Sequence, residues 1–126
     1  MEKKVVQTKL APAPIGPYNQ AIIANGTLYI SGQVCLDPAT GELKNKNIQE
    51  ETHQVMKNLE AILSEAGSSF KQVVKTTIFI TSMKQFAEIN EVYATYFTSD
   101  FPARETVEVS ALPKAANVEI SMIVAA

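Results

Sequence analysis

The sequence predicts an α+β fold in which two helices cover one face of a single mixed β-sheet. Segments with strand and helix patterns follow one another in the order strands, helix, strand, helix and two strands. Each helical segment carries one apolar stripe, so each must bury one side against the sheet. A length of 126 residues suits a single core, and we therefore assign residues 1–126 to one domain.

Composition restricts the class of protein. Apolar residues make up 46% and charged residues 19% of the chain, as in ordinary soluble globular proteins. A net charge of −2 argues against nucleic acid as the main partner, because phosphate binding favours a basic surface. No apolar run approaches the roughly 20 residues of a membrane span, and residues 1–7 lack the apolar core of a signal peptide. One cysteine cannot form an internal disulfide, so we expect a cytoplasmic protein.

Near the start of the chain, residues 5–10 are predicted to form a short strand and residues 11–18 a stiff loop. Three prolines in the loop withhold backbone donors and fix φ, while one glycine permits a sharp bend. We expect this loop to present Tyr18 and Asn19. A plain surface loop, or a polyproline ligand for an aromatic groove, would show the same composition.

A β-hairpin is predicted next, with strands at 21–24 and 27–33. The connecting Asn25-Gly26 accepts the positive φ angles of a type I′ turn at low cost. Ser31 and Gly32 lie near the end of the second strand, where the missing side chain of the glycine would let a ligand approach the backbone. An ordinary strand end fits the same residues.

Two residues that often carry chemistry receive a structural interpretation. Cys35 precedes a turn at 37–41 and is predicted to be a small packed residue rather than a nucleophile, because nothing nearby in sequence would lower its pKa. His53 falls on the polar side of the first helix and is predicted to be solvated. Without a second histidine or a cysteine cluster, we expect no transition-metal site.

Helix boundaries can be read from capping residues. The first helix is predicted to open at Asn47, with Glu50 completing a capping box, and to stop at Gly67. The second is predicted from about 83 to 97, with Ser82 as its cap. The apolar stripes of the two helices are formed by Ile48, Thr52, Val55, Leu59, Ile62, Leu63 and Ala66, and by Phe86, Ile89, Tyr93, Tyr96 and Phe97.

Three further strands complete the sheet. The β-branched run at 73–80 predicts a central strand. Two more follow in the last quarter, joined by a proline-bearing connection, and the first of them starts at Ala103. Alternation places Arg104 on the polar side of one strand and Glu119 on the polar side of the other. We therefore expect a guanidinium and a carboxylate on one polar sheet face, where rigid strands could hold a small charged substrate. A solvated outer face with an incidental arginine and glutamate gives the same pattern.

Six segments of the sequence together resemble the Rid (reactive intermediate deaminase, or YjgF) family. They run in the family's order over nearly the whole chain. One matching segment would be weak evidence, whereas six matches in order are specific. The segments are 11–21 (APAPIGPYNQA), 30–33 (ISGQ), 74–77 (VKTT), 101–104 (FPAR), 107–109 with 112–114 (VEV, LPK) and 118–120 (VEI). The resemblance implies a chorismate-mutase-like α+β fold, in which three chains associate through the sheet faces that the helices leave free. Ligand clefts would then lie between subunits.

The resemblance also implies an activity. Members of the family hydrolyse short-lived enamines and imines, such as 2-aminoacrylate, 2-iminopropanoate and 2-iminobutanoate, to 2-oxo acids and ammonia, without a metal or organic cofactor. This is a form of metabolite damage control. Two alternatives stay open: a module that binds 2-oxo acids without turnover and regulates a partner, and an action on RNA, which the acidic net charge disfavours.

Three residues match the catalytic positions of the family. Arg104 would hold the substrate carboxylate through two parallel hydrogen bonds, a geometry that lysine cannot offer. Glu119 would orient and deprotonate the attacking water, because partial burial can raise the pKa of a carboxyl toward neutrality. Tyr18 would line the cleft and could donate to the substrate or the water.

Four further residues match substrate-binding positions. Ser31 and Gly32 correspond to the strand end that wraps the ligand, Asn90 to a helix asparagine near the cleft, and Thr106 to a position where many members carry cysteine. A thiol role is therefore ruled out at Thr106, while its backbone can still contact the ligand. Ser121 stands where a second glutamate is common, which lowers the negative charge of the polar face.

Overall fold

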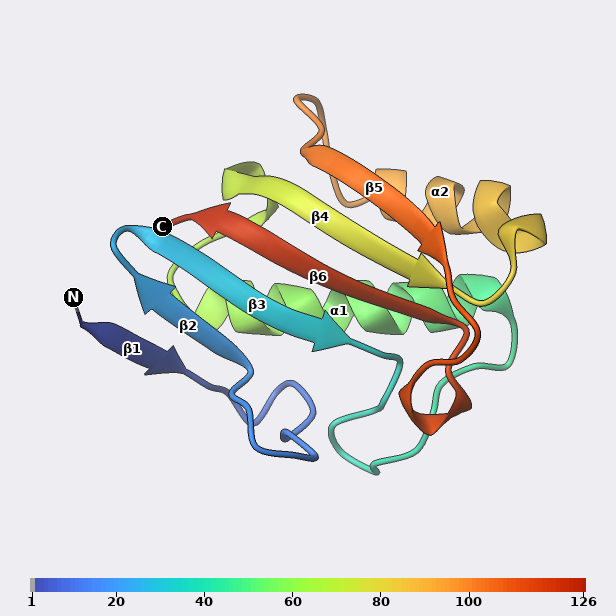
Figure 1. The fold of residues 1–126 in the computed structure, drawn as a ribbon, viewed down its shortest axis with the longest axis horizontal. Helices are drawn as coiled ribbons and strands as arrows, with labels where there is room; N and C mark the ends of the chain where they lie inside the picture. Colours follow the sequence, from blue (N-terminus) through green and yellow to red (C-terminus); the bar gives the residue numbers. More distant parts are fainter. Residues whose placement is uncertain (1) are drawn as a thin grey trace.

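The computed structural model describes residues 2–126, which form a six-stranded mixed sheet with two helices on one face (Figure 1). In sheet order, the strands are β1 (Lys3–Val6), β2 (Ala21–Ala24), β3 (Thr27–Gln33), β6 (Val118–Ala125), β4 (Val73–Ile80) and β5 (Ala103–Glu108). The helices are α1 (Ile48–Glu65) and α2 (Phe86–Ala94). Only the β4–β5 pair among these neighbours is parallel. The predicted α+β fold, with both helices on one face, is confirmed.

Local capping signals fix the ends of α1 as predicted. The Asn47 side chain accepts a hydrogen bond from the backbone N–H of Glu50 at 2.8 Å, and Gly67 after the helix has a φ of 72°. The capping box is not closed, because the Glu50 carboxylate accepts from the backbone N–H of Lys46 instead. Within residues 2–126, neither helix combines the length and hydrophobicity needed to cross a bilayer.

Two predicted element boundaries are wrong for reasons that lie outside the local sequence. The first strand covers Lys3–Val6 rather than 5–10. It pairs with β2, and its last residue, Val6, pairs with Ala21, the first residue of β2. The second helix is shorter than 83–97. A 3₁₀ turn precedes it, and after Ala94 the backbone changes to i→i+3 hydrogen bonds, while the hydroxyl of Thr95 donates to a carbonyl of the last turn.

Cys35 and His53 both lie in surroundings that indicate a structural role. Cys35 is fully buried, and burial, followed by the nearby Glu51 carboxylate, raises the pKa of its thiol to about 12, as suits the packed residue that was predicted. His53 was predicted to be solvated, but its ring also contacts another side chain: its Nδ1 lies 2.8 Å from the hydroxyl of Tyr96. The ring is half-buried because it links α1 to the segment after α2.

Strand register places Arg104 and Glu119 on opposite faces of the sheet. Arg104 lies opposite the buried Thr76, whose side chain faces the helices, whereas Glu119 lies opposite Phe79 on the open face. The prediction of one shared polar face is therefore wrong. The apolar side of β5, represented by Val107, points to the open face and is 42% exposed.

Candidate functional site

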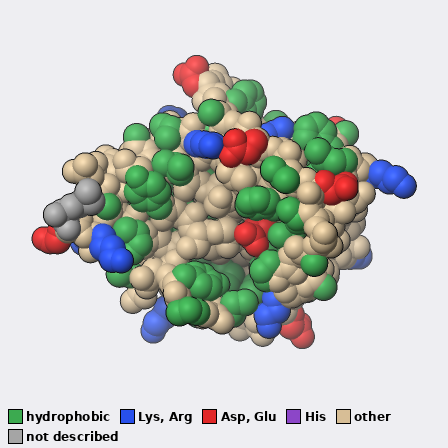
Figure 2. Space-filling model, in the orientation of Figure 1, with side chains coloured by type: hydrophobic (Ala, Val, Ile, Leu, Met, Phe, Trp, Pro, Cys, Tyr) green, Lys and Arg blue, Asp and Glu red, His purple; other side chains and the backbone are tan. Residues whose placement is uncertain are grey.

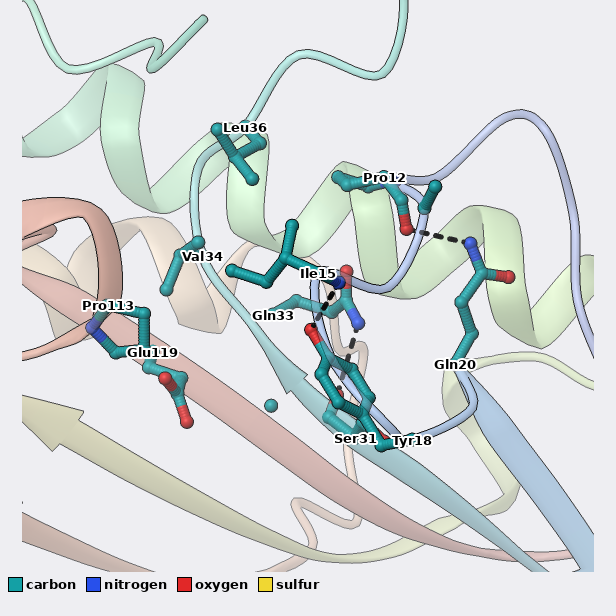
Figure 3. A pocket seen from close by; sticks show the side chains of 12 residues that line it. Pro12, Ile15, Tyr18, Gln20, Ser31, Gln33, Val34, Leu36, Pro113 and Glu119 are labelled. Carbon is teal, nitrogen blue, oxygen red and sulfur yellow. Dashed lines mark hydrogen bonds between the residues drawn. The ribbon is translucent and has the colours of Figure 1, made fainter. Parts of the chain in front are cut away.

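Six of the seven residues proposed for the site line two separate cavities. The larger, which we call the Glu119 cavity, has a volume of about 390 Å³ and lies at the end of β3 (Figure 3). It is lined by Pro12, Ala13, Ile15, Tyr18, Gln20, Ser31, Gly32, Gln33, Val34, Leu36, Pro113 and Glu119. The smaller, which we call the Arg104 pocket, has a volume of about 290 Å³ and is lined by Asn90, Tyr93, Ala94, Phe101, Pro102 and Arg104. One chain thus groups Tyr18, Ser31, Gly32 and Glu119, and keeps Arg104 and Asn90 apart from them.

A β-bulge shapes the floor of the Glu119 cavity. Ile30 of β3 pairs with Met122 of β6, but the next pair joins Gln33 to Ile120, so β3 holds one extra residue between these pairs. A bulge bends its strand and re-aims the side chains at that point. The bulge at 31–32 therefore places the predicted serine and glycine at the edge of the cavity, past the last residue of β3 that pairs with β2.

Glu119 lies directly over Gly32. A β-carbon placed on the glycine would be 2.8 Å from Cδ and 3.0 Å from Cγ of Glu119, so any larger residue would displace the carboxylate. Burial raises the pKa of the Glu119 carboxyl, and no cation of residues 2–126 forms an ion pair with it. A carboxylate whose pKa is raised binds a proton more readily, and it can act as a general base.

A buried amide holds the proline-rich loop in place. The Gln20 side chain, 3% exposed, donates from Nε2 to the carbonyl of Pro12 at 2.8 Å (Figure 3) and to that of Thr8 at 3.0 Å. Its Oε1 accepts from the backbone N–H of Thr8 at 2.7 Å. Sequence reasoning missed this residue, although a polar side chain directly before an apolar strand is a usable signal. Gln20 joins the loop to the start of β2 and so fixes one wall of the cavity.

Tyr18 reaches the cavity from the same loop. Its phenol oxygen accepts a hydrogen bond from the backbone N–H of Ile15 at 3.2 Å, which leaves its own O–H free to donate. Behind it, the Ser31 hydroxyl donates to the carbonyl of Asn19 at 2.6 Å and ties the loop to β3. Figure 3 shows Tyr18 and Glu119 on two sides of the same space. The loop therefore presents Tyr18 as the sequence predicted.

The remaining wall of the Glu119 cavity is mainly apolar. It includes Val34, Leu36 and Pro113, and the first two belong to a segment that α1 holds from behind. Nδ2 of the buried Asn58 donates to the carbonyls of Val34 at 3.0 Å and Leu36 at 2.9 Å. The cavity combines one carboxylate with apolar surface, which suits a small ligand that has a polar end and an apolar side chain.

The guanidinium of Arg104 is held by aromatic rings. Its Cζ lies 5.1 Å from the ring centroid of Tyr93 and 5.7 Å from that of Phe86, which are cation–π distances. The Tyr93 hydroxyl lies 2.8 Å from Oγ1 of Thr76, and burial raises the pKa of Tyr93 although Arg104 opposes this. No carboxylate of residues 2–126 pairs with Arg104, so its N–H groups can bind an anion.

Thr106 and Asn90 accompany Arg104. Thr106 stands two residues further along β5 and on the same side of the sheet, and its hydroxyl is buried without a hydrogen-bond partner among residues 2–126. Asn90 comes from α2 and lines the Arg104 pocket. Three of the seven predicted site residues therefore gather on the helix-facing side of β5, and four gather at the Glu119 cavity.

Comparison with known proteins gives concordant matches over nearly the whole chain. A family described as Endoribonuclease L-PSP matches residues 8–126. A RutC family protein of Pyrococcus horikoshii is 50% identical over 121 residues, which is 96% of both chains. The 2-iminobutanoate/2-iminopropanoate deaminase of Mus musculus is 49% identical over 121 residues, covering 96% of this chain and 90% of the mouse protein. The crystal structure of a conserved Rid family protein from Yersinia pestis superposes with a TM-score of 0.97 at 52% identity, covering 99% of this chain and 100% of that one.

Proposed function

Because the chain belongs to the Rid (YjgF) family, we propose that it hydrolyses short-lived enamines and imines, such as 2-aminoacrylate, 2-iminopropanoate and 2-iminobutanoate, to 2-oxo acids and ammonia. The similarity to the mouse deaminase supports this activity. The observation that carries the proposal is the Glu119 carboxylate, which lies half-buried over Gly32 with a raised pKa. A cytoplasmic location and a role in metabolite damage control remain predictions.

The proposed reaction is the addition of water to a C=N bond. Arg104 binds the substrate carboxylate, with the Thr106 hydroxyl and Asn90 beside it. Ser31 and Gly32 lie next to the C=N end of the substrate. Glu119 takes a proton from water while the oxygen bonds to the carbon of the protonated imine, whose nitrogen becomes a neutral amine. Glu119 then returns the proton to that nitrogen. As the C–N bond breaks, the hydroxyl group gives its proton to Glu119, so ammonia leaves and a 2-oxo acid remains. An enamine such as 2-aminoacrylate first becomes the imine by protonation at carbon.

The two halves of this site can meet only if they come from different chains. Arg104 and Glu119 are on opposite faces of one sheet, so we propose a homotrimer in which the Arg104 pocket of one subunit closes the Glu119 cavity of the next. The open sheet face supports association, because Val5, Tyr29 and Val107 are 46%, 49% and 42% exposed on it. Figure 2 shows this face, with patches of hydrophobic side chains and with charged side chains mostly toward its rim.

Turnover can be measured directly on the purified protein. An amino-acid oxidase or dehydratase generates the imine in place, and the 2-oxo acid that appears above the uncatalysed rate is recorded. Arg104→Lys should lose most of the activity while circular dichroism stays unchanged, because lysine cannot form the paired hydrogen bonds and a broken charge contact of this kind costs about 2–5 kcal/mol. Unchanged turnover in this variant would remove Arg104 from the mechanism.

Subunit mixing tests whether the cleft is shared between chains. Arg104→Ala and Glu119→Gln are each expected to be inactive alone. After unfolding and refolding together in equal amounts, they should recover about a quarter of the wild-type rate, since random exchange pairs the two intact residues in that share of clefts. A mixture that stays inactive, although light scattering shows mixed trimers, would contradict a shared cleft.

The same variants separate the enzyme from the alternatives. If the cleft only senses 2-oxo acids, the wild type binds them without turnover and Glu119→Gln has no activity to lose. If it is an enzyme, Glu119→Gln loses turnover but keeps 2-oxo acid affinity through Arg104. The description of the matched family names an endoribonuclease, so single-stranded RNA is the second ligand to test. Binding that weakens steeply with salt would favour RNA.

A further inference from the structure

Glu51 of α1 is a buried acid that the proposed reaction does not use. It is 1% exposed, although carboxylates are seldom fully buried unless their charge is satisfied. The residue falls among the inward-facing positions of α1, between the helix and the sheet. A buried charge at this place calls for a partner, and the backbone of β6 supplies it.

Three donors at the start of β6 bind the Glu51 carboxylate. Oε2 accepts from the backbone N–H of Asn117 at 2.7 Å and of Val118 at 3.2 Å, and Oε1 accepts from Nδ2 of Asn117 at 2.8 Å. Hydrogen bonds to an ionised acceptor are among the stronger ones in proteins. Glu119 is the next residue after these donors, so the carboxylate fixes the backbone from which the proposed base projects.

The Glu51 carboxylate also acts on the segment that contains Cys35. After burial, it is the second cause that raises the pKa of the Cys35 thiol. Cys35 lies between Val34 and Leu36, which line the cavity. Through its three hydrogen bonds, Glu51 connects α1 to the strand that carries Glu119.

We infer that Glu51 is a positioning residue, which holds the first residues of β6 so that the Glu119 carboxylate stays over Gly32 inside the cavity. This inference rests on the proposed function for its kinetic consequence. Loss of the three bonds would free the start of β6 and let Glu119 move toward water. A displacement of about 1 Å in a reacting group can cost on the order of 100-fold in rate.

Two substitutions at the same site separate positioning from bulk packing. Glu51→Met keeps the length of the side chain but offers no acceptor to the three donors. Glu51→Gln can keep every bond: its carbonyl accepts from both backbone N–H groups, and its amide N–H donates to Asn117 once that side chain turns over. The Thr81 hydroxyl, now 3.3 Å from Oδ1 of Asn117, would then accept instead of donate.

The kinetic readout is the split between kcat and KM in the coupled imine assay. Glu51→Met should lower kcat roughly 10- to 100-fold per folded molecule, with KM and 2-oxo acid affinity unchanged because Arg104 binds the carboxylate. Its acid limb in the pH–rate profile should move to lower pH, since Glu119 becomes hydrated. Glu51→Gln should retain most of the rate. Equal kcat and pH profiles in Glu51→Met and wild type would overturn the inference.

A second readout needs no substrate and therefore separates this inference from the proposed function. Titration of ¹³C-labelled glutamate by NMR should show a lower pKa for Glu119 in Glu51→Met than in wild type, even if the wild type hydrolyses no imine. If Glu51→Met does not fold, Asn117→Ala removes one of the three donors, together with the weak hydrogen bond from the Thr81 hydroxyl, and should shift the same signal by less. An unchanged Glu119 titration in the folded variant would refute the positioning role.

Discussion

At residue 32 the site has no room for a side chain, because the Glu119 carboxylate occupies the space that a β-carbon would take. Gly32→Ala should lower kcat about 10-fold or more by pushing the base out of place, while the melting temperature changes little. Steady-state kinetics and thermal denaturation of the same sample test this expectation. Full activity in Gly32→Ala would mean that Glu119 does not need its present position.

The raised pKa of Glu119 makes stability depend on pH in a defined direction. Between its unfolded and folded pKa values the folded state binds more protons, so the free energy of unfolding falls as pH rises through this window. Activity should rise over the same window, because the base must be deprotonated. Urea denaturation from about pH 4 to about pH 8 should show a smaller decline in Glu119→Gln than in wild type. Identical slopes in the two proteins would contradict the assignment.

At this scale the sequence predicted which residues share a strand face more reliably than which side of the sheet that face covers. Alternation along β5 correctly groups Arg104 with Thr106, because the period of a strand is local. It does not say which side of the sheet that group faces. The side is set by pairing with β4, where Arg104 lies opposite the buried Thr76, and this pairing joins residues far apart in the chain. Gln20 and Glu51 were missed because most of their partners are backbone groups far away in the chain, which the local sequence does not identify.

At the scale of elements, the connection between β5 and β6 holds unfavourable backbone angles. Lys114 and Ala115 have φ angles of 62° and 57°, which side chains disfavour, and the neighbouring Pro113 lines the Glu119 cavity. Ala115→Gly should stabilise the fold by about 1 kcal/mol, after the added freedom of the unfolded chain is subtracted. Ala116→Gly, at a φ of −68°, should destabilise it by a similar amount. Chemical denaturation of both variants gives the comparison, and a loss of stability in Ala115→Gly would argue against strain.

Elements with local signals were predicted closely, and those whose ends depend on a partner were not. The hairpin at 21–24 and 27–33 follows from Asn25-Gly26, whose φ angles of 54° and 78° suit a type I′ turn. Strand β4 likewise matches its β-branched run, and α1 its caps. By contrast, the end of β1 at Val6 depends on its pairing with Ala21, the first residue of β2, and not on the local sequence.

For the whole molecule, the open sheet face determines assembly if the proposed trimer is correct. Tyr29→Glu places a charge on that face and should weaken association by on the order of 3 kcal/mol or more, because the carboxylate would be buried without a partner. The variant should sediment as a monomer and lose turnover, since one chain does not complete the cleft. Lys57→Glu, on the exposed side of α1, is the control and should leave both properties intact. A trimeric, active Tyr29→Glu protein would place the interface elsewhere.

Much of the fold could be predicted from one chain, whereas the complete site could not. Two amphipathic helices require a single covered face, and this follows from the pattern of one sequence. In the proposed trimer, the meeting of Arg104 with Glu119 is a property of several chains. The strand pattern predicted that the two residues share one sheet face, and the family resemblance predicted clefts between subunits. Within one chain the two residues do not meet, because the structure places them on opposite faces of the sheet.

Strand β6 lies near the middle of the sheet, between β3 and β4, yet it is the sixth strand in chain order (Figure 1). During synthesis on a ribosome, the edges of β3 and β4 that pair with β6 therefore stay unpaired until residues 118–125 have left the exit tunnel. Unpaired edges of this kind invite aggregation. Protection of the nascent chain by a chaperone should thus matter most just before this strand emerges.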